Sequence, residues 1–81
     1  MKLPRDVSGI ELASLLRRFG YQIARQTGSH MRLRSTFIGH EHVVTVPVHD
    51  PLKTGTLNGI LLDVAGYLGL AKSDLVAKLF G

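Results

Sequence analysis

The chain has 81 residues, enough for one small domain with a single core rather than a deep cleft between two lobes. It contains no cysteine, which excludes a disulfide framework and a cysteine-based zinc site, and its hydrophobic content of 44 % is typical of a folded protein. The net charge is +4, and residues 1–40 hold seven Lys or Arg against two Asp or Glu, whereas residues 41–81 hold three against four. A basic, arginine-rich half indicates a polyanionic partner, although solvated arginines that serve only solubility explain it equally well.

Neither a secretory leader nor a membrane span is expected. Residues 1–6 lack the apolar run of a signal peptide, and no stretch approaches the roughly 20 apolar residues of a membrane span. We therefore expect a cytoplasmic domain of residues 1–81 that does not enter a membrane. Its core is expected at about residues 9–66, and residues 67–81 form a C-terminal extension.

The first predicted element is an amphipathic helix over residues 9–19. Ser8 is a suitable N-cap, Glu11 three residues later completes a capping box, and Gly20 fits a left-handed residue after the last turn. The apolar stripe at helical spacing consists of Ile10, Leu12, Ala13, Leu16 and Phe19.

Residues 21–26 and 30–35 predict an antiparallel hairpin with a turn at residues 27–29. The second strand alternates strictly, with His30, Arg32 and Arg34 on one face and Met31 and Leu33 on the other. We expect the face of His30, Arg32 and Arg34 to be open to solvent.

The register of this hairpin can be predicted from its side chains. A three-residue loop places Ile23 opposite Leu33 and Ala24 opposite Arg32, whereas a two-residue turn would oppose Ile23 to an arginine. The three-residue loop is therefore favoured. It puts Arg25 on the face of Ile23, so the arginine would have to extend outward at the strand end.

A third strand over residues 42–46 is ended by Pro47, and a second helix begins at Thr54 or the residue after it. Gly66 is expected to end this helix, and Gly59 inside it indicates a close packing contact. Its apolar face consists of Leu57, Ile60, Leu61, Val64 and Ala65.

A short final helix over residues 74–80 follows, capped by Ser73. The order of elements predicts an α+β fold, α-β-β-β-α with a short C-terminal helix. Its three-stranded antiparallel sheet has both main helices on one face.

Four short segments, in this order, resemble the HicA toxin family. They are residues 15–21 at the end of the first helix, residues 26–30 with Gly28-Ser29-His30, residues 44–47 followed by His49, and residues 52–57 followed by Ile60 and Gly66. The resemblance spans about residues 9–66. It implies a fold like the double-stranded RNA-binding domain and the toxin role in a type II toxin–antitoxin system. It also implies metal-independent cleavage of mRNA, a HicB-like antitoxin partner, and His30 as the active histidine.

The chemistry of RNA suits a single histidine. RNA supplies its own nucleophile, the 2′-hydroxyl, and the neutral imidazole of His30 can take its proton as a general base. Arg32, two residues on, can bind a phosphate and stabilise charge in the transition state. Taken alone, a histidine such as His30 is more often a solvent-facing strand residue without a role, and the match of Gly28-Ser29-His30 to the family is what favours the active histidine.

Further residues extend the predicted phosphate-binding surface. Arg34 and Arg25 add charge, Gly28 permits close approach of the backbone, and Ser29 offers a hydroxyl. Lys53 and Thr54 stand at a helix N-terminus, where free N–H groups attract phosphate; simple capping by Thr54 is the alternative.

His40, His42 and His49 are the other candidate ligands, but no cysteine or well-spaced carboxylate completes a tetrahedral set, so neither metal nor cofactor is expected. Two alternatives to the ribonuclease remain open. One is a non-catalytic RNA-binding module of the same fold, and the other is an interaction protein whose basic face binds an acidic partner.

Overall fold

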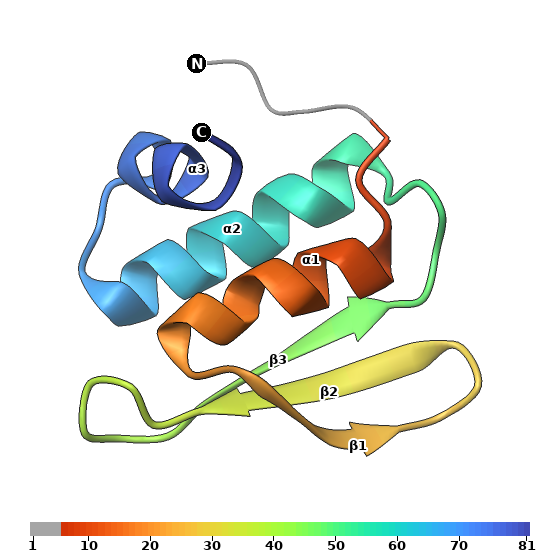
Figure 1. The fold of residues 1–81 in the computed structure, drawn as a ribbon, viewed down its shortest axis with the longest axis horizontal. Coiled ribbons are helices and arrows are strands. Elements are labelled where there is room, and N and C mark those ends of the chain that lie inside the picture. Colours follow the sequence, from red (N-terminus) through yellow and green to blue (C-terminus); the bar gives the residue numbers. More distant parts are fainter. Residues whose placement is uncertain (1–5) are drawn as a thin grey trace.

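A computed structural model of the protein describes residues 6–81 (Figure 1). Its elements are α1 (Gly9–Leu16) with a 3-10 turn (Arg17–Phe19), β1 (Gln22–Gln26), β2 (His30–Ser35), β3 (His42–Pro47), α2 (Thr54–Leu68) and α3 (Lys72–Phe80). This order confirms the predicted α+β fold. Residues 1–5 lie outside the described range. The prediction about a secretory leader and part of the basic charge of the first half rest on these residues.

The sheet and the helices form layers. The strands are antiparallel in the order β1-β2-β3, α1 and α2 lie side by side over one face, and α3 packs against α2 (Figure 1). An Nη1 atom of Arg18 donates to the carbonyl of Lys78 at 2.6 Å, so the end of α3 is also tied to the end of α1. In residues 6–81 no helix is both long and apolar enough to cross a membrane.

Both ends of α1 form as local chemistry predicts. The Ser8 hydroxyl accepts from the Glu11 amide at 3.0 Å, and Gly20 has the left-handed φ of 79°. Leu12 and Leu16 are fully buried, but Ile10 is 62 % exposed, so its place in the buried stripe was predicted wrongly. Ile10 faces the gap beside the edge strand β1, where the sheet no longer covers the helix.

The later helices differ from expectation at their ends. α2 continues through Gly66 to Leu68 and ends at Gly69, which has φ 71°. A Cβ at Gly59 would meet nothing within 4 Å, so no close contact requires that glycine. α3 begins at Lys72 without a side-chain cap, so Ser73 does not cap it.

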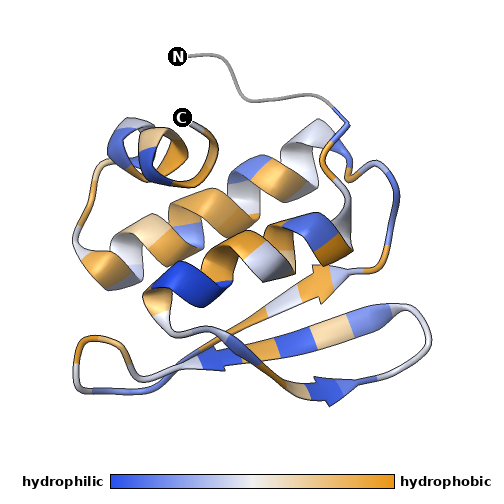
Figure 2. Ribbon diagram, viewed as in Figure 1, coloured by the Kyte–Doolittle hydropathy of each residue, from blue (hydrophilic) through white to orange (hydrophobic). Residues whose placement is uncertain are grey.

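The core lies between the sheet and the helices. Along β2 the residues alternate between exposed and buried, a pattern visible as alternating hydropathy in Figure 2. Its buried members Met31 and Leu33 pack beneath α1 and α2. α3 adds three buried side chains, so the core includes residues beyond 66: Leu75, Val76 and Leu79.

Candidate functional site

A bulge in β1 sets the geometry of the hairpin. Ile23 pairs with Leu33 as predicted, but the next pair is Arg25 with Arg32, with a register shift between Ile23 and Arg25. The predicted pairing of Ala24 with Arg32 is therefore wrong. The Thr27 amide donates to the His30 carbonyl at 2.9 Å and Gln26 pairs with Met31, so only Gly28 and Ser29 form the turn and the predicted three-residue loop is wrong.

The bulge decides where Arg25 points. Residues directly opposite each other in a sheet project from the same face. Arg25 therefore shares the open face with Arg32, while Ile23 stays on the helix side with Leu33. Arg25 was predicted to project from the buried face and to extend outward from there. The extra residue at the bulge instead places its side chain directly on the open face.

A shallow pocket of about 200 Å³ lies on this open face. It is lined by Arg25 from β1, Thr27 from the turn, His30 and Arg32 from β2, and Thr45 from β3. Arg32 pairs with Thr45 across the β2–β3 ladder, which brings a third strand into the pocket. The sheet thus places an imidazole, two guanidinium groups and two hydroxyls around one hollow.

Ser29 contacts the His30 ring and connects the turn to the residue after β3. The Ser29 hydroxyl lies 3.0 Å from His30 Nδ1, and the Ser29 carbonyl accepts from the Val48 amide at 2.9 Å. A hydroxyl on Nδ1 leaves Nε2 as the ring nitrogen without a described protein partner. A Cβ at Gly28 would meet nothing within 4 Å, so the turn offers open access at that residue.

The charges in the pocket favour an anion. Arg25 and Arg32 are directly opposite each other, an arrangement of like charges that destabilises a sheet. Within residues 6–81, neither guanidinium lies within 4.0 Å of a carboxylate. A bound phosphate would relieve this repulsion and use the planar fork of each arginine.

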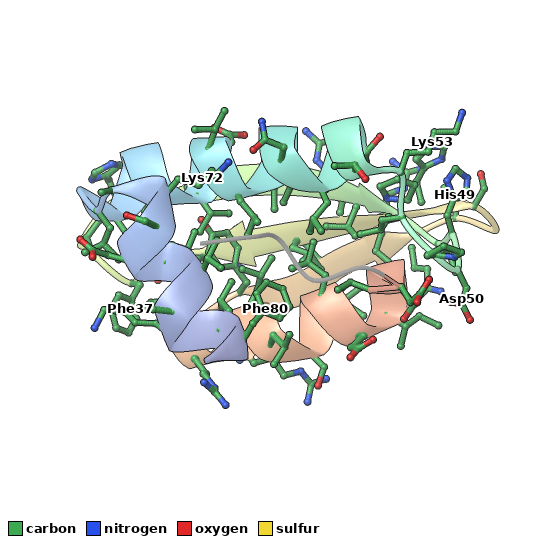
Figure 3. All side chains as sticks on the ribbon, turned by 90° about the horizontal axis from the view of Figure 1, so that it is seen from above. Phe37, His49, Asp50, Lys53, Lys72 and Phe80 are labelled. Atoms are coloured by element: carbon green, nitrogen blue, oxygen red, sulfur yellow. The ribbon has the colours of Figure 1, made fainter. Side chains whose placement is uncertain are left out.

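The remaining predicted phosphate contacts are dispersed. Arg34 is on the same face but lines a different hollow with Gln22 and Thr36. Lys53 and Thr54 stand at the start of α2, at the same end of the molecule as the β1–β2 turn (Figures 1 and 3). Lys53 is the N-cap residue and makes no side-chain capping bond, so capping by Thr54 is not observed.

Two pocket residues were not singled out from the sequence. Thr45 lies directly opposite Arg32 in the β2–β3 ladder and so projects from the same face. A predicted register for the third strand would have identified Thr45 as a pocket residue. Thr27 was assigned only to the turn.

The other histidines do not gather into a metal site. His42 lies between the Tyr21 hydroxyl, 2.7 Å from Nδ1, and an Asp63 carboxylate oxygen, 3.1 Å from Nε2. Its ring also stacks on Tyr67, with ring centroids 4.7 Å apart. Burial, and then the neighbouring Tyr67 and Asp63, raise the pKa of the Tyr21 hydroxyl well above its ordinary value. In the described part of the chain, no group of three His, Cys, Asp or Glu residues could hold a metal ion.

Residues 9–67 match the family model described as the HicA toxin of bacterial toxin–antitoxin systems. The chain belongs to the HicA toxin family. Membership gives it the role of a toxin and implies an antitoxin as partner. Comparisons with curated proteins and with solved structures give no significant match.

Proposed function

We propose that this HicA-family chain is an endoribonuclease that cleaves mRNA without a metal ion and uses His30 as its proton-transfer group. The observation that carries the proposal is the pocket that groups His30 with Arg25 and Arg32 on the open face of the sheet. A flat, basic and exposed surface suits an extended polyanion better than a small metabolite, which would need an enclosed site.

The proposed mechanism uses the nucleophile that RNA carries. His30 Nε2 takes the proton of a 2′-hydroxyl, and the 2′-oxygen attacks the adjacent phosphorus as the 5′-oxygen leaves with a proton from water. Ser29 on Nδ1 would hold the ring and fix which nitrogen is free. Arg25 and Arg32 would bind the phosphoryl oxygens and stabilise the charge that grows there.

Residues outside the pocket would position the strand rather than react. Arg34 would contact a neighbouring phosphate along β2, and Lys53 and Thr54 another at the start of α2. Gly28 leaves room at the turn for the approaching backbone. In the family setting, a HicB-like antitoxin in the same cytoplasm would block this activity.

The test compares purified wild type with His30→Ala on single- and double-stranded RNA in the presence of EDTA. We expect cleavage by the wild type and a loss of about 100-fold or more in the variant, the range typical of removing a general base. His40→Ala is the matched control, because His40 is an exposed histidine in the β2–β3 loop and does not line the pocket.

Two outcomes would contradict the proposal. Undiminished cleavage by His30→Ala, with its fold intact by circular dichroism, would remove His30 from the mechanism. Salt-sensitive binding of RNA without cleavage by the wild type would identify a non-catalytic RNA-binding module instead.

A further inference from the structure

A second surface lies on the opposite face of the sheet from His30. A groove of about 240 Å³ runs between α1 and the edge strand β1. Its floor is formed by Met31 and Leu33 of β2, and its walls by Ile10 of α1 and Ile23 of β1. Ile10 is 62 % exposed and Ile23 46 % exposed, so two large apolar side chains border the groove in contact with solvent.

The groove is continuous with an open sheet edge. β1 is the first strand in the order β1-β2-β3, and all of its residues are exposed. Along its outer side the peptide groups of β1 have no strand partner within the described chain. An extended segment could pair with this edge and place alternate side chains into the groove, as in β-strand addition.

The charges beside the groove select the kind of partner. Arg17 lines the groove at the end of α1, and no acidic side chain of residues 6–81 lines it. A second copy of this chain would bring the same net charge of +4 and its own Arg17 to this surface, whereas a segment that carries carboxylates could pair with Arg17. The arrangement therefore favours an acidic segment over self-association.

We propose that the α1–β1 groove and the β1 edge bind an extended acidic segment of a partner protein, with alternate apolar side chains inserted between Ile10 and Ile23. The antitoxin is the partner that family membership implies. The groove is on the other face of the sheet from the His30 pocket. Binding of the partner at the groove and the β1 edge therefore does not require it to cover His30. The proposal does not depend on RNA cleavage.

The probe is a short synthetic peptide of alternating valine and glutamate, titrated into the ¹⁵N-labelled full chain and followed by NMR. We expect amide shifts to concentrate in β1 and α1. The same peptide with lysine in place of glutamate should bind at least about tenfold more weakly, because it meets Arg17 and the net positive charge of the chain with like charge.

Ile23→Asp tests the apolar part of the surface and should weaken binding about tenfold, the scale of a residue that anchors an interface. Leu62→Asp is the matched control, because Leu62 is an apolar residue of α2 with 53 % exposure that does not line the groove. Both substitutions are at exposed positions, and circular dichroism would verify the fold.

Three results would overturn the proposal. One is equal binding of the glutamate and lysine peptides, and another is a set of shifts centred on His30 and Arg32. The third is concentration-dependent dimerisation through β1 in analytical ultracentrifugation, which would assign the edge to a second copy.

Discussion

Replacing Gly9 with alanine should destabilise the protein, although alanine is the better helix former. Gly9 opens α1, and its amide donates to the His49 carbonyl at 2.9 Å. An added Cβ would lie 1.9 Å from the carbonyl oxygen of Pro47 and 3.0 Å from its carbonyl carbon. Because both atoms belong to the backbone, the clash cannot be relieved by a rotamer change. The start of α1 and the end of β3 must move apart.

The magnitude follows from opposing terms. Alanine gains about 0.5–1 kcal/mol over glycine in a helix. Against this stand about 1–3 kcal/mol for overpacking and about 1 kcal/mol for the hydrogen bond from Gly9 to His49. We expect a net loss of about 2 kcal/mol in the free energy of unfolding, which lowers the Tm of a domain of this size by roughly 10 °C.

Gly59→Ala in α2 is the matched control, because a Cβ there meets nothing within 4 Å. It should stabilise the protein by about 0.5–1 kcal/mol. Urea unfolding followed by circular dichroism measures both variants under identical conditions. A Gly9→Ala variant as stable as the wild type, beside a stabilised Gly59→Ala, would refute the contact between α1 and β3.

Three further predictions concern the site and the core. Arg32→Ala should reduce RNA cleavage about 100-fold, because Arg32 lines the His30 pocket. Arg34→Ala should reduce it less than about tenfold, because Arg34 is on the same face but lines a different hollow. Equal losses in the two variants would contradict this separation. The raised pKa of Tyr21 means that folding is stabilised below the ordinary tyrosine pKa and weakened as pH rises above it. Urea unfolding should therefore show the wild type losing stability above about pH 10, and Tyr21→Phe losing less; identical alkaline profiles would exclude a role for this hydroxyl. Leu75→Ala should cost about 2–5 kcal/mol by the same method, because Leu75 is fully buried, and a neutral effect would mean that α3 is not part of the core.

The features predicted correctly from the sequence are those fixed by neighbouring residues. Ser8 caps α1 because its hydroxyl reaches an amide three residues on, and Gly20 ends the following turn because it accepts a positive φ. The alternation of residues 30–35 likewise places His30 and Arg32 on one face without reference to the rest of the chain.

The features that failed depend on contacts between distant segments. Gly66 and Gly69 are both plausible helix ends, and the burial of Tyr67 in the core carries α2 past the first of them. The bulge at Ala24 allows a tight turn at one end of the hairpin and the pairing of Ile23 with Leu33 at the other. Its position depends on both strands together, so the sequence of one strand does not predict it. The contacts of His42 with Tyr21 and Asp63 each span 21 positions of sequence, beyond the reach of any local pattern.

The bulge has a consequence for how this surface can change in evolution. Amino-acid substitutions at position 25 can alter the side chain there but not the side of the sheet from which it projects. Removing the single codon for Ala24 would place Arg25 directly after Ile23, and the alternation of a regular strand would keep Arg25 opposite Arg32 on the open face while β2 and β3 keep their pairing. The length of β1 can therefore change by one residue at this point without separating the two arginines from His30, whereas a substitution of Arg25 removes one of them outright.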